Sequence, residues 1–315
     1  MTRRLIISLC ILLSLLLQAS SIDFATFMDV DSGEGIFGSA MDNKHLGFKE
    51  NLAATTTYMP YVVNKDNVST ELIYIPAGIF QMGCDLENPD EIDCTEYWVN
   101  GNELPLHTVF LDGYAIDKYE VTNFQYRACV SAGVCIKPKE NFSYNRVAYF
   151  DNLLYDNYPV IYISWNDAND FCSWLDKRLP SEAEWEKAAR GPNFSTQRYP
   201  WGNNDSDCKL ANIKYDEKFG TCEMDTTEVG SYPLGESPYG VMDMAGNVWE
   251  FVNDWYQYDY YVESPYYDPL GPPEATEKVW RGGGFNAGWE DARVSRRAGI
   301  SPNFRGNYIG FRCAK

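Results

Sequence analysis

Histidine is scarce in this chain, which has only His45 and His107 among its 315 residues. A Ser-His-Asp triad and a histidine-rich iron site both need imidazole groups that come together in the fold. His45 falls in a stretch without predicted structure and His107 opens a predicted strand, so neither chemistry is expected. No Cys-x-x-Cys pair occurs either, which argues against a zinc site.

Positive charge is also in deficit: 26 lysines and arginines face 45 aspartates and glutamates, and the net charge is −19. Nucleic acids and anionic membranes are therefore poor partners. Cations or basic ligands suit such a chain better, although solubility alone also explains its acidity. Past residue 21, no apolar run reaches the about 18 residues that suggest a membrane helix, so no membrane span is expected.

The one marked apolar run, Leu5 to Leu17, follows Arg3 and Arg4 and precedes the small residues up to Ser21. This pattern predicts a secretory signal over residues 1–21, with cleavage near Ser21 and a secreted or periplasmic protein. Residues 22–70 contain scattered glycines and polar residues without periodicity, and we expect a flexible tether there. The composition changes at Glu71, and residues 71–315 are expected to form the folded domain.

Cysteine usage fits an exported protein. Without Cys10, which lies in the predicted signal, the nine cysteines of the chain become eight. An even number in an oxidising compartment favours disulfides. Short spacing favours the pairs Cys84–Cys94, Cys129–Cys135 and Cys208–Cys222, which leaves Cys172 and Cys313.

The local patterns predict an α+β domain with short strands, few short helices and long ordered loops. Strands are expected on both sides of a Pro-Ala-Gly turn in 71–83, from His107 onward, and at 278–282 and 309–314. Three helices are expected after capping boxes, in which a serine or threonine is followed three residues later by an acid or glutamine. These boxes are Thr122 with Gln125, Ser164 with Asp167, and Ser181 with Glu184.

Carboxylates, tryptophans and turn glycines are interleaved in the stretch from Tyr239 to Trp255. Oxygen ligands held at a glycine turn suit a hard cation such as calcium. The alternative is a hydrogen-bonded turn in which the acids cap backbone groups. The residues alone leave both interpretations open.

Several motifs, in this order, resemble the formylglycine-generating enzyme (sulfatase-modifying factor) family. They include Ile75-Pro-Ala-Gly-Ile-Phe-Gln-Met-Gly83, Lys177-Arg-Leu-Pro-Ser-Glu-Ala-Glu-Trp-Glu186, Met244-Ala-Gly-Asn-Val-Trp-Glu250 and Gly310-Phe-Arg-Cys313. The resemblance covers about residues 71–315. It implies a variant of the C-type lectin fold, with a small twisted sheet, few helices and extensive loops. It also implies a disulfide between Cys172 and Cys313.

Structural calcium is implied by the resemblance as well. One ligand set would comprise Asp243, the carbonyls of Gly246 and Val248, and Glu250. A second would comprise Asn212, the carbonyl of Ile213, and Asp225.

The resemblance fails at the catalytic centre. Formylglycine-generating enzymes hold copper(I) with two thiolates shortly after an Arg-Gly-Gly-Ser element. Here Gly284 replaces the serine, Ala287 aligns with the first copper cysteine, and no cysteine lies between Cys222 and Cys313. Alanine offers no donor atom to a soft metal, so neither copper nor the copper oxidase activity is expected.

We therefore favour a non-catalytic binding protein that holds a peptide, protein or glycan with its C-terminal loops. The candidate contacts are Trp249, Asn286, Trp289, Arg293 and Arg297, since flat rings with amide and guanidinium groups suit recognition. The opposing interpretation packs the rings into loop cores and pairs the arginines with carboxylates. The rival functions are another modifying enzyme on this scaffold, or formylglycine generation with metal ligands from elsewhere, which would need two cysteines free and close together.

Overall fold

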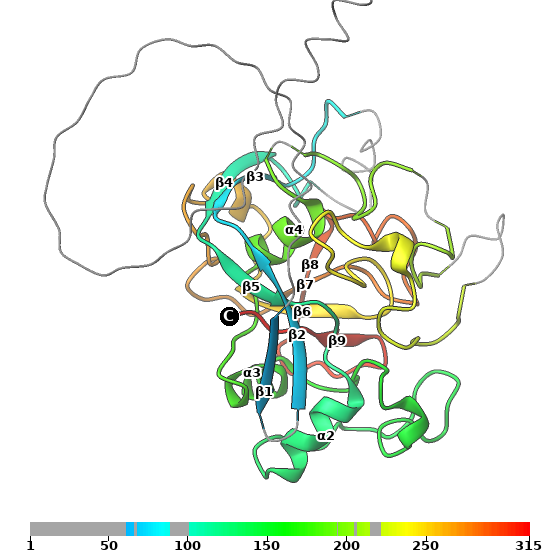
Figure 1. Ribbon diagram of the computed structural model, residues 1–315. Helices are drawn as coiled ribbons and strands as arrows, with labels where there is room; N and C mark the ends of the chain where they lie inside the picture. Colours follow the sequence, from blue (N-terminus) through cyan, green and yellow to red (C-terminus); the bar gives the residue numbers. More distant parts are fainter. Residues whose placement is uncertain (1–60, 66–67, 89–100, 194, 205–206, 215–221) are drawn as a thin grey trace, which may run out of the picture. The chain divides into compact units, whose positions relative to one another are not determined.

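The described strands form three small sheets (Figure 1). The computed structural model describes residues 61–65, 68–88, 101–193, 195–204, 207–214 and 222–315. The sheets have the strand orders β1-β2-β5, β3-β4 and β8-β7-β6-β9. The strands are β1 Tyr61–Lys65, β2 Val68–Ile75, β3 Gly78–Met82, β4 His107–Leu111, β5 Tyr114–Asp117, β6 Trp249–Trp255, β7 Lys278–Arg281, β8 Arg297–Ile300 and β9 Ile309–Phe311.

The folded domain begins earlier than the sequence suggested. Strand β1 pairs antiparallel with β2, and both start inside the stretch predicted to be a tether. Buried Val68 and Thr70 continue the inward-facing positions of β2 to the N-terminal side of Glu71. Among the described residues, the folded domain therefore begins at residue 61 and not at residue 71. Residues 1–60, with the predicted signal and most of the tether, lie outside the described residues.

Short helices begin where the capping boxes placed them. They are α2 Asn123–Ser131, α3 Trp165–Trp174 and α4 Glu182–Arg190, together with the 3-10 turns η2 Leu153–Tyr155, η3 Pro233–Gly235 and η4 Tyr260–Val262. Thr122, Ser164 and Ser181 are the N-caps, and each box makes both of its reciprocal hydrogen bonds. Satisfying two otherwise free backbone donors at once explains why these three starts were readable from sequence.

The four-stranded sheet holds the C-terminal part of the chain together. Strand β6 pairs in parallel with β9, through Trp249 opposite Ile309, and antiparallel with β7. Strand β6 was not predicted, because Trp249–Trp255 belongs to a stretch interpreted as a cation site or a hydrogen-bonded turn. Five of its seven residues are buried, and a strand covered on both faces lacks the alternating pattern that identifies a strand. Strand β8 was also missed.

Disulfides confirm three of the expected pairs: Cys129–Cys135, Cys172–Cys313 and Cys208–Cys222. Cys84 is disulfide-bonded too, but its expected partner Cys94 lies outside the described residues. The bridge from α3 to the C-terminus stands beside an aromatic cluster in which Tyr126 stacks on Phe171 at 5.6 Å. No helix among the described residues is long and apolar enough to cross a membrane.

Helix α4 is covered on all sides. All nine of its residues are buried, and it packs against β3, β4, β6 and β7. Trp185 is fully buried in the apolar cluster around the helix. The same helix also carries Glu182, Glu186 and Arg190 into the interior. Charges buried this way need partners. The two glutamates pair with Arg281 at the end of β7, Arg297 at the start of β8 and Arg190 on the helix itself.

Candidate functional site

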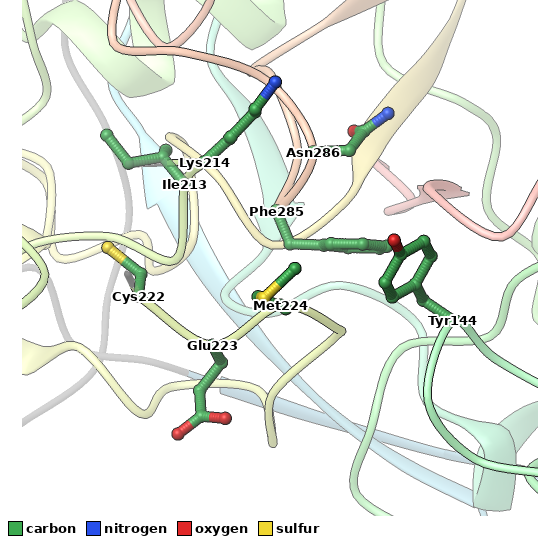
Figure 2. A pocket seen from close by; sticks show the side chains of 8 residues that line it. All are labelled: Tyr144, Ile213, Lys214, Cys222, Glu223, Met224, Phe285 and Asn286. Carbon is green, nitrogen blue, oxygen red and sulfur yellow. The ribbon is translucent and has the colours of Figure 1, made fainter. Parts of the chain in front are cut away.

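A cavity of about 280 Å³ lies between four segments of the described chain (Figure 2). We call it the loop pocket. It is lined by Tyr144, Ile213, Lys214, Cys222, Glu223, Met224, Phe285 and Asn286. Its volume lies just below the range of about 300–1,000 Å³ found for ligand pockets, and it shares their mostly apolar walls with a few polar groups.

The apolar walls of the loop pocket are partly exposed. Phe285 and Ile213 are buried, whereas Tyr144 is 59% and Met224 55% exposed. The Phe285 ring points towards Tyr144, with ring centroids 6.2 Å apart. In Figure 2 the Lys214 and Asn286 side chains lie at one edge, and Glu223 points away at the other.

Main-chain hydrogen bonds hold the segment that supplies Phe285 and Asn286. Phe285 N donates to Asn247 O at 2.9 Å, and Lys214 N donates to Ala287 O at 2.8 Å. These bonds tie the segment to the turn before β6 and to the loop that carries Ile213. The position of the pocket wall therefore depends on backbone pairing and leaves its side chains free to contact a ligand.

Of the five predicted ligand contacts, only Asn286 lines the loop pocket. Trp249 is buried, stacks on Trp280 at 4.3 Å and lies beneath Gly284. Trp289 is half-buried, with the Arg198 guanidinium 4.5 Å from its ring centre. Both tryptophans thus support the loop from beneath or beside it.

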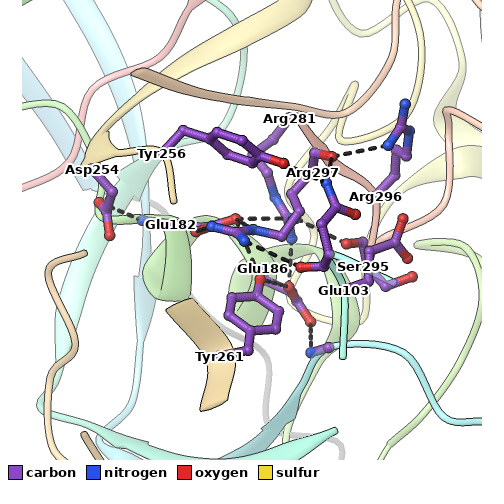
Figure 3. Close-up of polar contacts among 12 residues, drawn as sticks. Glu103, Glu182, Glu186, Asp254, Tyr256, Tyr261, Arg281, Ser295, Arg296 and Arg297 are labelled. Carbon is purple, nitrogen blue, oxygen red and sulfur yellow. Dashed lines mark hydrogen bonds and ion pairs between the residues drawn. The ribbon is translucent and has the colours of Figure 1, made fainter. Parts of the chain in front are cut away.

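Arg293 and Arg297 lie in the core, in what we call the buried ion-pair network. Figure 3 shows the part of this network around Arg297 and Glu182. Arg293 donates to both carboxylate oxygens of Glu103 at 2.7 and 2.9 Å. Arg297 does the same to Glu182 at 2.7 and 2.9 Å. Both guanidinium groups are fully buried and paired with carboxylates, so neither can contact a ligand at the surface.

Glu186 is the centre of the same network. It accepts from Arg281 Nη2 at 2.5 Å, from Arg190 Nη2 at 3.1 Å and from Gly83 N at 2.8 Å. Arg281 also lies 3.4 Å from Glu182. The network connects α4 to β3 and to the 281–297 segment. Its function is to fix the base of the C-terminal loops.

Asp254 lies at the edge of this network, and the pKa of its carboxyl group is raised. Its Oδ2 accepts from Glu182 N at 2.8 Å. Burial, and then the neighbouring Glu182 carboxylate, raise the pKa of Asp254 from 3.8 to about 8. The folded protein therefore keeps this proton at pH values where the unfolded chain has lost it.

Stability should consequently fall as pH rises from about 4 to about 8, because over this window the unfolded state releases a proton that the folded state holds. Asp254→Asn keeps a hydrogen-bond acceptor and cannot ionise. We expect this variant to lack the pH-dependent fall in the free energy of unfolding, which is on the order of a few kcal/mol. Urea unfolding across this pH range measures it. The exposed Asp259→Asn is the matched control and should leave the pH profile as in the wild type.

The first predicted calcium set surrounds Asp243. Burial, and further the Glu250 carboxylate, raise the pKa of Asp243 to about 6, and burial followed by Asp243 and Glu250 raises the pKa of Glu120. Such an excess of carboxylate charge suits a cation. Glu250 is less available, since it accepts from Arg312 at 2.7 Å through both oxygens and from Trp185 Nε1 at 2.9 Å.

In the described part of the chain, no three His, Cys, Asp or Glu side chains form a group that could hold a metal ion. A cation at Asp243 would therefore need backbone carbonyls as well, as in the predicted set with Gly246 and Val248. Gly246 has a φ of +83°, and a Cβ there would lie 2.5 Å from Asn212 O. Only glycine fits this turn.

The second predicted set is Asn212, Ile213 and Asp225. Asn212 Oδ1 is buried without a hydrogen-bond partner among the described residues, which would suit a cation. The Asp225 carboxylate, by contrast, is occupied: it accepts from Ser143 Oγ and Asn145 N and pairs with Arg146.

The model of the sulfatase-modifying factor enzyme 1-like domain matches residues 60–315 of this chain. The chain belongs to this family. It is 32% identical to the formylglycine-generating enzyme of Streptomyces coelicolor, over 77% of this chain and 88% of that enzyme. The solved structure of PvdO from Pseudomonas aeruginosa is 26% identical and covers 83% of this chain and 99% of its own, with a TM-score of 0.66.

A further relative is named serine/threonine-protein kinase Pkn1, from Chlamydia trachomatis serovar L2. It is 33% identical over 95% of this chain but 48% of its own length. The chain thus spans about half the length of that protein. These likenesses establish the fold as the formylglycine-generating-enzyme variant of the C-type lectin fold.

The family's copper position is Ala287, according to the resemblance described above. Ala287 is buried in the apolar cluster next to Trp249, and its N donates to Gly284 O at 2.8 Å. Tyr144, Lys214 and Met224 of the loop pocket were not predicted. Tyr144 and Met224 come from loops without periodicity, so no sequence signal could have paired them with Phe285.

Proposed function

We propose that this member of the sulfatase-modifying factor family is a non-catalytic binding domain. Its loop pocket would take an apolar side chain of a peptide or protein partner. The observation that carries the proposal is the exposed apolar rim made by Tyr144 and Met224 over buried Phe285. Apolar anchors inserted into such pockets dominate binding energy at protein interfaces.

The absence of thiolates supports a non-catalytic role. No cysteine stands between Cys222 and Cys313, and every cysteine among the described residues is disulfide-bonded. A copper(I) centre would need two free sulfur donors close together. Breaking a buried bridge such as Cys172–Cys313 to supply them would disconnect the C-terminus from α3.

The polar edge of the loop pocket supports a polypeptide partner. The exposed Lys214 ammonium and Asn286 amide can bond the carbonyl oxygens that flank an inserted side chain, and the amide can also accept from a peptide N–H. A hydroxyl-rich glycan fits less well than an apolar side chain, because Ile213, Met224 and Phe285 give the pocket apolar walls.

Methyl NMR of isotope-labelled methionine tests the proposal directly. We expect N-acetyl-phenylalaninamide to shift the Met224 methyl signal, because the pocket would enclose its ring, and to leave buried Met242 and Met244 unchanged. Tyr144→Ala should weaken binding roughly tenfold, as loss of an aromatic contact of about 1–2 kcal/mol implies. Tyr258 is 50% exposed and does not line the pocket, so Tyr258→Ala is the matched control.

Two results would contradict the proposal. One is a Met224 signal that responds to methyl glucoside and not to the aromatic amide. The other is aldehyde formation in a Cys-x-Pro-x-Arg peptide incubated with the protein, copper and oxygen, which would restore the oxidase alternative.

Structural calcium at Asp243 and export form the remaining parts of the proposal. The raised pKa values of Asp243 and Glu120 support a cation that neutralises their charge. The apolar run before Ser21 and the three described disulfides support an oxidising compartment outside the cytoplasm.

A further inference from the structure

The Asp225 carboxylate is saturated by protein donors. Its Oδ2 accepts from Ser143 Oγ at 2.5 Å and from Asn145 N at 2.8 Å, and lies 2.9 Å from Arg146 Nη1. Its Oδ1 accepts from Thr226 N at 2.8 Å. Asp225 is itself buried. A cation that approached it would have to displace these donors and face the positive charge of the guanidinium.

Arg146 is held as firmly as its partner. Its guanidinium carbon lies 4.9 and 5.0 Å from the ring centres of Tyr155 and Tyr158, and 6.0 Å from that of Tyr149. Arg146 Nη2 also donates to Thr226 O at 3.1 Å. Aromatic faces attract a cation most strongly where water is excluded, and the Arg146 side chain is 19% exposed. The tyrosines therefore fix the guanidinium beside Asp225.

We propose that the Arg146 guanidinium takes the place of a metal ion at Asp225 and fixes two walls of the loop pocket without calcium. Ser143, Asn145 and Arg146 flank Tyr144 along one loop, and Asp225 directly follows Met224. The ion pair thus joins the two segments that carry the exposed apolar rim. Arg146 and Asp225 are positioning residues for the pocket.

This inference separates the two predicted calcium sets. Each set contains a guanidinium, Arg312 paired with Glu250 in the first and Arg146 paired with Asp225 in the second. In the first set Asp243 and Glu120 remain beside that pair, and burial together with neighbouring carboxylates raises the pKa of both, whereas the second set has one carboxylate for its one guanidinium. Within this set, Asn212 Oδ1 is a buried acceptor without a hydrogen-bond partner among the described residues. Asn212 Nδ2 donates to the Asp225 backbone carbonyl at 2.8 Å, which leaves the carboxylate to Arg146. We therefore expect one calcium ion per chain and none at Asp225.

Equilibrium dialysis and thermal melting with calcium or EDTA test the inference on the full chain and on single variants. Asp225→Asn should lower the melting temperature equally with calcium and with EDTA and leave the calcium stoichiometry unchanged. Asp243→Asn should lose the bound ion and the calcium-induced shift in melting temperature. Arg146→Gln leaves Asp225 without its cation and should gain an ion, whereas Arg146→Lys keeps the charge and should not.

Binding of N-acetyl-phenylalaninamide gives a readout that a general loss of stability would not reproduce. We expect the wild type to bind it equally with EDTA and with calcium. Arg146→Gln should bind it several-fold more weakly in EDTA and regain binding when calcium is added. If Arg146→Gln does not fold in EDTA, its recovery by calcium supports the inference and its failure with both contradicts it.

Loss of a calcium ion in Asp225→Asn would overturn the inference. A wild type that binds no calcium would refute only the Asp243 site, since the gain of an ion in Arg146→Gln still reports on Asp225. If the aromatic amide does not bind the wild type, the proposed function is refuted. The inference about Arg146 and Asp225 is then tested by the calcium stoichiometries of the variants alone.

Discussion

Replacing both Cys172 and Cys313 with alanine is expected to lower the free energy of unfolding by about 5 kcal/mol. The bridge joins residues separated by 141 positions, and the chain-entropy cost of a crosslink grows with the loop that it closes. Both sulfurs are fully buried, so reduction alone should be slow in the folded state. In a domain of this size the melting temperature should fall by about 10–20 °C.

The short bridge Cys208–Cys222 provides the matched control. Its sequence separation is 14, for which the same model gives about 3 kcal/mol. Urea unfolding of the two double alanine variants should therefore rank the long bridge above the short one. Equal losses, or the reverse order, would mean that local packing and not loop closure determines the contribution of the bridge.

Glu182→Gln is expected to cost about 3–5 kcal/mol, because it removes one charge from a buried set of ion pairs. Glu182 accepts from Arg297 through both oxygens and lies 3.4 Å from Arg281. All three side chains are nearly or wholly buried. Glutamine keeps the shape but takes from Arg297 the carboxylate that it pairs with, and leaves Arg281 with Glu186 in the network of Figure 3.

Asp151→Asn is the exposed counterpart. The Lys137–Asp151 pair is 62% and 47% exposed, and such surface pairs contribute about 0–1 kcal/mol. The losses in the free energy of unfolding of the two variants, measured by chemical unfolding, should differ by several kcal/mol. A loss in Glu182→Gln no larger than in Asp151→Asn would show that the buried network is dispensable for stability.

The parts of the fold that were predictable depend on local sequence. Ser164 with Asp167 fixes the start of α3 through bonds between residues three apart, so the signal and its cause lie in the same short segment. The pairing of Cys208 with Cys222 is similar, since close spacing alone favours it. The family motifs supplied the fold class, because they reflect the whole arrangement and not one element.

Elements that depend on distant neighbours were not predictable. Strand β6 exists because β7 and β9 flank it, and nothing within Trp249–Trp255 reveals those neighbours. The same holds for Arg293 and Arg297, which were candidate ligand contacts with pairing to carboxylates as the alternative. The structure shows the carboxylate pairing, but the partners Glu103 and Glu182 lie 190 and 115 positions away and could not be named from the sequence.

The candidate site was only partly predictable for the same reason. Asn286 was identified because it belongs to one loop with a recognisable position in the family. Tyr144 and Met224 join it only after Arg146 and Asp225 bring two other loops together. A long-range ion pair between irregular segments leaves no periodic trace in a sequence.

The backbone bonds of the 284–292 segment have a consequence for evolution and engineering. Phe285 N, Ala287 O and Ala292 N are satisfied by main-chain partners, which do not depend on the identity of the side chains between them. The exposed position 286 can therefore be exchanged at little cost to folding. The scaffold separates a hydrogen-bonded backbone frame from an exchangeable side chain, so a library randomised at this position offers a route to new specificities on an unchanged domain.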